Sequence, residues 1–188
     1  ILALTWGALQ VQITLAGFLN GESLWSKAQK QSVIDLETYA TSGAAADLSD
    51  FRRHYAVLES DRWARDAIAS GDFDREKVAQ AFARGSVIPG AIPGMIFILQ
   101  HFRSAPHISV ALQAWYSTDD SIAEFAGIAN EQRAAYAGGG PSVAELARQR
   151  TRIHALNDYI EPRTHVFSRE IAHGAAWVGT ILFSSVLA

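Results

Sequence analysis

The sequence predicts an all-α protein, an antiparallel four-helix bundle whose first and last helices continue into membrane spans. Three observations support this prediction. Apolar residues recur at spacings of three and four over most of the chain, as they do on the buried face of a helix. There is little alternation of β-branched residues, and no Asn-Gly hairpin signal occurs. Both ends of the chain are apolar runs without Asp, Glu, Lys or Arg.

The composition excludes several classes of protein. The 188 residues are enough for one domain with a sizeable core. The net charge of -3 does not suggest the strongly basic face that nucleic acid binding requires, so we expect no nucleic acid partner. Because the chain has no cysteine, it can form neither disulfides nor thiolate metal sites.

The two charge-free ends have the character of membrane helices. Residues 1–21 reach the length of about 20 mostly apolar residues that crosses a bilayer, and residues 171–188 come close to it. We interpret both as truncated spans, because neither carries the Lys/Arg cluster typical of the cytoplasmic side. Two alternatives remain open: a secretory signal peptide over residues 1–19, which lacks a basic start and an Ala-x-Ala site, or core helices of a soluble bundle. The predicted domains are thus two spans, 1–21 and 171–188, and a helical bundle over 22–170.

The first two helices follow from stripes of apolar residues. The first is predicted to leave the apolar N-terminal run and to continue to about residue 41, where a Thr-Ser-Gly segment stops it. The second is predicted to end near Ser70, where a Ser-Gly-Asp segment breaks the pattern. The two stripes comprise Trp25, Ala28, Ser32, Leu36 and Tyr39 in the first helix and Leu48, Phe51, Tyr55 and Leu58 in the second.

The middle of the chain is less regular. Residues 74–85 are predicted to form a short helix that Gly85 closes. Two Pro-Gly pairs follow within the segment 88–106 and indicate turns. Residues 95–102 are apolar almost all round, which predicts a short buried helix.

Two further long helices are predicted on either side of a glycine-rich loop. One begins at Pro106, a residue favoured at the first helical position, and runs to about Ala137. The other begins at Ser142, which has capping-box spacing with Glu145, and enters the apolar C-terminal run. Pro162 lies inside this last helix, where it should kink the helix or remove one hydrogen bond.

A charged cluster on the second helix suggests a ligand site. Arg62 and Arg65 lie three residues apart on one helix face and flank Trp63. Two guanidinium groups beside an indole are suited to cradle a carboxylate or another anion. The alternative is a solvated helix face on which the two arginines pair with Asp61 and Asp66.

Further candidate ligand residues lie near and on the next long helix. Asp119 falls on an inward stripe beside Trp115, and a buried carboxylate needs a partner, so we expect it to pair with one of those arginines or to form part of a polar pocket. The irregular segment 88–106 either offers backbone groups to a ligand or merely caps the membrane-distal end of the bundle. The candidate ligand-binding set is Arg62, Trp63, Arg65, Arg103, His107, Trp115 and Asp119.

The sequence predicts no metal, no cofactor and no active site. None of the 6 histidines forms an H-x-x-x-H or H-E-x-x-H pattern. His154 and His165 would lie about 16 Å apart on one helix, too far to share a metal. His101 and His107 flank a turn and could approach each other. Because no nucleophile motif and no facing carboxylate pair occurs, the chain is not expected to be an enzyme.

Several runs occur in a distinctive order, namely GESLWSKAQKQSVIDLETYA, FRRHYAVLESDRWARDA, IPGMIFILQHFRSAPHISVALQAWYSTDDSIAE and RIHALNDYIEPRTHVFSREI between two apolar helices. The run PGMIF…HFRSAPH…AL…W…D is the most characteristic part. Over roughly residues 22–172 and both spans, this order resembles the helical sensor region of two-span bacterial signalling proteins, the kind that precedes diguanylate cyclase, phosphodiesterase or histidine kinase modules. The resemblance implies a periplasmic bundle anchored in the inner membrane and a cytoplasmic output domain after Ala188. It implies no particular ligand.

We therefore expect the sensor input region of a transmembrane receptor, which responds to envelope stress or to an unknown small-molecule or anionic ligand. The last helix would shift against the first and pass the signal on, with Pro162 biasing that motion. Such receptors usually work as dimers, so we expect a homodimer. The main alternative is a helical interaction protein, membrane-associated or soluble, without signalling output. A helical enzyme or cofactor carrier would need a bound group that the spacing does not predict.

Overall fold

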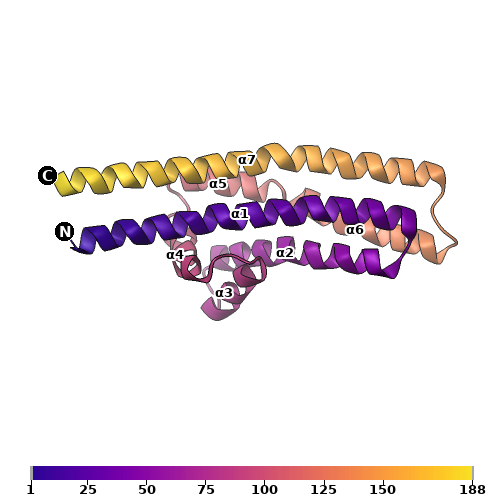
Figure 1. Cartoon of the computed structure of the whole chain (residues 1–188), viewed down its shortest axis with the longest axis horizontal. Coiled ribbons are helices and arrows are strands. Elements are labelled where there is room, and N and C mark those ends of the chain that lie inside the picture. Colours follow the sequence, from indigo (N-terminus) through magenta and orange to yellow (C-terminus); the bar gives the residue numbers. More distant parts are fainter. Residues whose placement is uncertain (1, 188) are drawn as a thin grey trace.

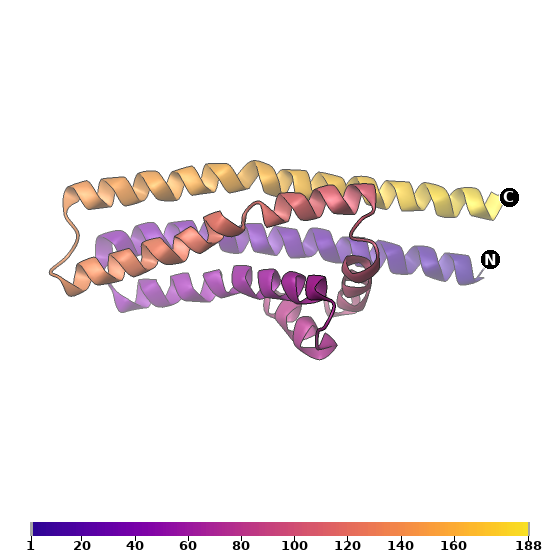
Figure 2. The same cartoon turned by 180° about the vertical axis from the view of Figure 1, so that it is seen from behind.

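The computed structural model describes the backbone of residues 2–187 and the side chains of residue 7 and residues 9–177. Over these residues the chain is helical without any strand, which confirms the predicted all-α class. The two longest helices, α1 (Leu2–Ser42) and α7 (Val143–Leu187), lie antiparallel along the molecule. The start of α1 and the end of α7 therefore lie at the same end of the molecule (Figures 1 and 2).

Glycines and capping residues end and start the long helices where the sequence predicts. Gly43 follows α1 with a φ of 63°, and Gly71 ends α2 (Ala45–Ser70) with a φ of 84°, a left-handed conformation that glycine adopts without strain. At the start of α7, the amide of Ser142 donates to the Glu145 carboxylate over 2.7 Å, and the amide of Glu145 donates to the Ser142 hydroxyl over 3.3 Å. This reciprocal pair is the predicted capping box.

Shorter elements connect α2 to the last two helices and cover one side of the molecule near the chain ends (Figure 1). The helix α4 begins earlier than predicted, because Pro93 fits its first turn, where no N–H donor is needed. The connecting elements are α3 (Arg75–Arg84), the 3₁₀ turn η1 (Pro89–Ala91), α4 (Ile92–His101) and α5 (Pro106–Tyr116). The helix α6 (Asp119–Ala137) follows them.

The prediction of one continuous helix from Pro106 to about Ala137 is wrong. The chain breaks at Ser117 and Thr118, between α5 and α6, and Figure 2 shows the two helices meeting at this break. Both hydroxyls donate to carbonyls three residues earlier, Ser117 to Ala114 and Thr118 to Trp115, each over 2.7 Å. Such local hydrogen bonds compete with continuation of a helix.

Two clusters of buried apolar side chains stabilise the structure. The cluster farther from the chain ends combines residues of α1, α2, α6 and α7. The cluster nearer the chain ends joins α1, α2 and α7 to the short elements α3, η1, α4 and α5. There α1 approaches η1 so closely at Gly17 that an added Cβ would collide with the side chain of Ala91. The short elements therefore replace α6 as packing partners in this half.

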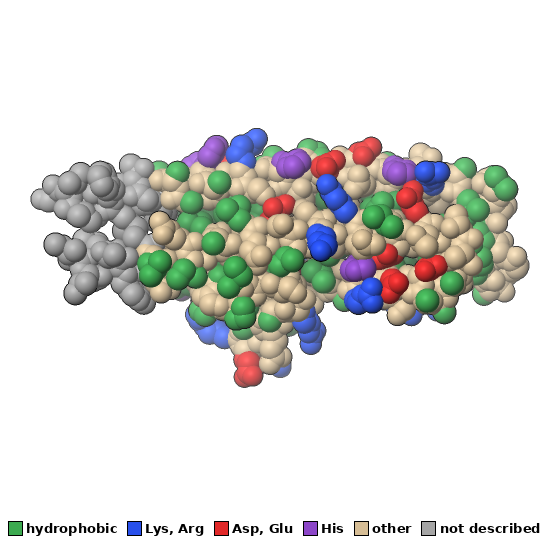
Figure 3. All heavy atoms as spheres, in the orientation of Figure 1, with side chains coloured by type: hydrophobic (Ala, Val, Ile, Leu, Met, Phe, Trp, Pro, Cys, Tyr) green, Lys and Arg blue, Asp and Glu red, His purple; other side chains and the backbone are tan. Residues whose placement is uncertain are grey.

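Within the part of the chain that the structure describes, no helix has a stretch both long and apolar enough to cross a membrane. The predicted spans at 1–21 and 171–188 lie partly outside that part, since the side chains of residues 1–6, 8 and 178–188 are not described. On the face seen in Figure 3, acidic and basic side chains are interspersed and form no single basic area.

Candidate functional site

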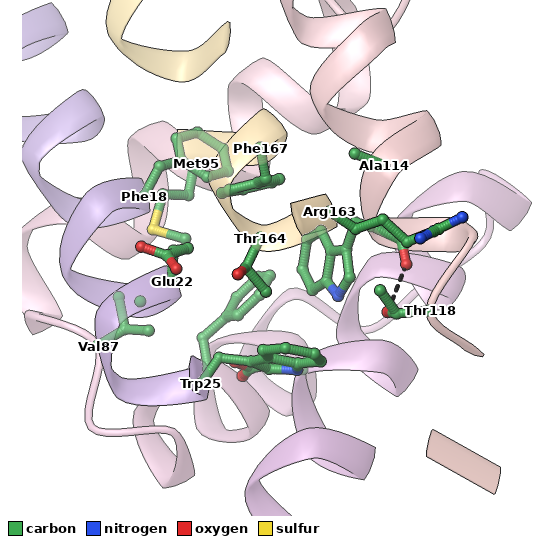
Figure 4. A pocket seen from close by; sticks show the side chains of 14 residues that line it. Phe18, Glu22, Trp25, Val87, Met95, Ala114, Thr118, Arg163, Thr164 and Phe167 are labelled. Carbon is green, nitrogen blue, oxygen red and sulfur yellow. Dashed lines mark hydrogen bonds between the residues drawn. The ribbon is translucent and has the colours of Figure 1, made fainter. Parts of the chain in front are cut away.

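A narrow pocket lies near the middle of the molecule, where the two core clusters meet. It is lined by residues of α1, α2, α3, α4, α5 and α7, and its cavity volume is about 40 Å³. Figure 4 shows how its side chains converge from these helices. The lining residues are Phe18, Gly21, Glu22, Trp25, Asp61, Phe82, Val87, Met95, Ala114, Trp115, Thr118, Arg163, Thr164 and Phe167.

Asp61 is the most unusual of these residues. It projects from α2 and is only 4% exposed, yet its Oδ1 atom has no hydrogen-bond partner among the described residues. Burial raises the pKa of this carboxyl from 3.8 to about 8, because loss of water disfavours the charged form. Since a buried polar group normally has a partner, an unpaired carboxyl that lines a pocket indicates that something else completes it.

The end of α3 packs directly against this carboxyl group. A Cβ atom added to Gly85 would lie 2.8 Å from Oδ1 of Asp61, closer than two such atoms pack. The glycine therefore provides the space in which the carboxyl group lies. Among the residues that the structure describes, neither this glycine nor any side chain supplies a hydrogen bond to Oδ1.

Aromatic rings form much of the rest of the wall. Trp115 and Phe167 meet edge to face, with ring centroids 5.7 Å apart. The face of an aromatic ring carries partial negative charge and attracts a cation within about 6 Å of its centroid. Together with the carboxyl group of Asp61, these rings give the pocket a chemistry suited to positive charge. The five rings are Phe18, Trp25, Phe82, Trp115 and Phe167.

The polar side chains at the pocket are arranged consistently with this chemistry. Glu22 adds a second carboxylate, which accepts a hydrogen bond from the Ser26 hydroxyl over 2.7 Å. Arg163 contributes its aliphatic stem, because its guanidinium stacks 3.2 Å from the ring centroid of Tyr159 and donates to the carbonyl oxygen of that residue. Figure 4 shows this guanidinium pointing away from the centre of the pocket and Thr164 pointing into it.

Of the two arginines expected as partners of Asp119, Arg65 forms hydrogen bonds with it. The guanidinium of this fully buried arginine donates to both carboxylate oxygens of Asp119, over 3.1 and 2.6 Å, and also to Asp66. It stacks on two rings as well, 3.9 Å from the centroid of Tyr116 and 5.0 Å from that of Trp115. Arg65 is thus fully engaged within the protein and presents no free donor pair to an anion.

The predicted anion cradle of two arginines around Trp63 does not form. Trp63 lies on the other side of α2, half-exposed beside α3, whereas Arg65 points inward. The side chain of Arg62 is partly exposed, and its Nε atom lies 3.8 Å from Oδ2 of Asp66 and 3.9 Å from Oδ2 of Asp119. The alternative of a solvated charged face fits Asp66 but is wrong for Asp61, which is buried without a partner.

The remaining predicted ligand residues lie elsewhere. Arg103 donates to the backbone carbonyl of Ala69 over 3.2 Å and is exposed. His107 contacts Glu170 of α7 over 3.0 Å, on the side of the molecule nearer the chain ends. Of the predicted set, the structure brings together Arg62, Arg65, Trp115 and Asp119, and only Trp115 also lines the pocket.

Sequence reasoning missed Asp61, although a signal was present. The apolar stripe of the second helix ends in Leu58, and the next positions at spacings of three and four are Asp61 and Arg65. Extending the stripe by one turn would have placed both side chains inward.

No protein-family model, curated protein or solved structure matches this chain.

Proposed function

We propose that this chain is the ligand-sensing input region of a bacterial transmembrane receptor, and that the pocket around Asp61 binds a small organic cation. A protonated amine or a quaternary ammonium ion fits this chemistry. The observation that carries the proposal is the buried carboxyl group of Asp61, which has no partner and lies among aromatic rings.

The charges around the pocket favour a cation as its ligand, whereas the sequence had suggested an anion bound by the arginine cluster. A positive group beside Asp61 would stabilise its charged form and would also lie next to aromatic side chains that line the pocket, such as Trp25 and Phe82. An anion would face two carboxyl groups, those of Asp61 and Glu22, and the nearby guanidinium of Arg65 is already bound to Asp119. The narrowness of the pocket favours a small occupant.

The position of the pocket supports a sensing role. Its walls include Phe18 and Glu22 of α1 and Thr164 and Phe167 of α7, the two helices whose ends lie together. A ligand that draws these walls closer would shift α7 against α1, and a shift of this kind can bias an output domain. Attachment to the inner membrane, a periplasmic location, a four-helix-bundle architecture and a homodimer are parts of the same proposal and rest on the sequence.

A thermal unfolding series tests the ligand. We would titrate the chain with methylammonium and tetramethylammonium, and use tert-butanol as a neutral compound of similar shape. A ligand at 100 times its Kd stabilises by about 2.7 kcal/mol, and each kcal/mol raises the midpoint of a protein of this size by about 2–4 °C. We expect at least one ammonium ion to raise the midpoint by several degrees, and tert-butanol to leave it unchanged.

Two variants serve as a matched pair in this experiment. Asp61→Asn removes the pocket carboxyl group and should abolish the ammonium response. Asp72→Asn removes an exposed carboxyl group from the loop after α2 and should leave the response intact. Equal shifts with the ions and with tert-butanol, or a full ammonium response in Asp61→Asn, would overturn the proposed ligand site.

Pro162 provides a separate test of the signalling part. It lies inside α7 directly before two pocket residues, Arg163 and Thr164, and the helix runs through it without interruption. In a receptor that joins this chain to a diguanylate cyclase or kinase output, we expect Pro162→Ala to change the output at a given ligand concentration. Pro141→Ala, in the loop before α7, should not. Unchanged output in Pro162→Ala would remove this residue from the relay.

A further inference from the structure

A second cluster of polar side chains lies where α5 packs on α7, on the side of the pocket nearer the chain ends. His107 lies in the first turn of α5, while Glu170 and His173 lie three residues apart on α7 and therefore on one helix face. The Nδ1 atom of His107 lies 3.0 Å from Oε2 of Glu170, and the rings of the two histidines meet edge to face with centroids 5.8 Å apart. One ligand atom from each residue lies within 4.8 Å of the other two.

We infer that His107, Glu170 and His173 form a binding site for a divalent transition-metal ion, with Zn²⁺ as the ion that fits best. Two imidazoles and one carboxylate are a donor set that suits Zn²⁺, and three protein ligands leave one tetrahedral position for water. Imidazole donors disfavour Mg²⁺ and Ca²⁺, which bind through oxygen ligands. This site is independent of the pocket around Asp61.

The present separations require only small rotations to reach coordination geometry. Ligand atoms about 2.1 Å from a tetrahedral metal lie about 3.4 Å from one another, compared with at most 4.8 Å here. His173 is exposed and the side chain of His107 is 34% exposed, so both imidazoles have room to turn and an ion has a route of entry. Glu170 is the more fixed member, since its side chain is 14% exposed.

The helices come together closely at this point. A Cβ atom added to Gly174 would lie 3.4 Å from the Cβ atom of His107, so the glycine next to His173 lets α5 approach α7. Arg169 is the competing cation. Its Nε atom lies 3.4 Å from Oε1 of Glu170, its side chain is 59% exposed, and the other oxygen of that carboxylate remains directed at His107.

Metal titration of the untagged full chain tests the inference. After treatment with a chelator and dialysis, we would titrate the protein with Zn²⁺ by calorimetry and with Co²⁺ by visible absorption, and use Mg²⁺ as a comparison ion. We expect one Zn²⁺ per chain, a Co²⁺ spectrum typical of four ligands, and no response to Mg²⁺. Absence of Zn²⁺ binding would contradict the inference and would leave an ordinary His107–Glu170 ion pair.

Three variants locate the bound ion. His173→Gln and Glu170→Gln should each weaken Zn²⁺ binding by at least about tenfold, because each removes a ligand. His165→Gln removes an exposed histidine from the same helix and should leave the affinity unchanged. Helicity measured by circular dichroism checks that all three fold. Equal loss in His165→Gln, or full affinity in both ligand variants, would place the ion elsewhere.

The tests of the Zn²⁺ site and of the ammonium pocket can be told apart. Asp61→Asn should not change Zn²⁺ binding, and His173→Gln should not abolish the ammonium response. Failure of one site therefore leaves the other intact.

Discussion

Two acidic side chains, Asp61 and Asp119, have very different surroundings in the folded protein. Asp119 is bound through both oxygens by the buried guanidinium of Arg65, which also stacks on Trp115. Asp61 lies one helical turn before Arg65, yet the guanidinium of Arg65 is bonded to Asp66 and Asp119, and Oδ1 of Asp61 has no hydrogen-bond partner in the described part of the chain. The difference indicates that Asp119 has a structural role, whereas the carboxyl group of Asp61 is available to a ligand.

The largest effect that follows from this comparison is on the stability of the paired site. Arg65→Met would leave the Asp119 carboxylate without its main partner, and loss of one member of a buried ion pair typically costs about 3–5 kcal/mol. Because Asp119 is partly exposed, we expect the lower end of that range, measured as the free energy of unfolding in urea.

Two further variants sharpen this prediction. Arg62→Met removes an arginine 3.9 Å from the same carboxylate but about half-exposed, and should cost less than about 1 kcal/mol. The double variant Arg65→Met with Asp119→Leu should recover much of the loss, since it leaves no unpaired charge. If Arg65→Met costs no more than Arg62→Met, the pair is not a structural anchor.

The next effect is a pH dependence at the unpaired site. The pKa of Asp61 is about 8 in the folded protein and near 3.8 when it is exposed, so the folded state holds a proton that the unfolded state has lost between these values. This carboxyl therefore lowers stability as pH rises from about 4 to 8, by up to about 1.4 kcal/mol per pH unit.

The measurement is the difference between the native chain and Asp61→Asn. Urea unfolding at a series of pH values should show the variant gaining relative stability as pH rises towards 8. Taking this difference removes the pH-dependent contributions of all groups that the substitution leaves unchanged. A difference that is flat between pH 5 and 8 would show that Asp61 is not held in its protonated form.

A smaller effect is expected from narrowing the pocket. Gly85→Ala would place a methyl group 2.8 Å from Oδ1 of Asp61, and the carboxyl group would have to move. Overpacking of this kind costs about 1–3 kcal/mol, and we expect the lower end because the φ of −70° at Gly85 suits alanine. We also expect ammonium ions to raise the unfolding midpoint of Gly85→Ala less than that of the native chain. Gly90→Ala, where no atom lies within 4 Å of the added Cβ, is the control.

Much of the fold could be predicted from the sequence, because glycines, prolines and a capping box mark most helix ends. The break between α5 and α6 was missed, since apolar spacing continues across it and only the hydroxyls of Ser117 and Thr118 signal it.

The sites were harder to predict, because each depends on residues from different helices. Spacing along one helix reveals Arg62 and Arg65 but not which of them is buried. It also cannot show that His107 of α5 meets Glu170 and His173 of α7, although the Glu-x-x-His spacing on α7 was visible. The histidine predicted to approach His107, His101, instead packs against Phe97.

The most direct test of the central claim is calorimetry of ammonium binding at pH 7 in two buffers with different ionisation enthalpies. If a cation binds against the carboxyl group of Asp61, each binding event should release a large fraction of a proton, because a carboxyl group with a pKa of about 8 is mostly protonated at this pH. Asp61→Asn should then show neither binding nor proton release. Binding without proton release in the native chain, or the same isotherm in Asp61→Asn, would contradict the claim that this buried carboxyl group is the ligand's counter-charge.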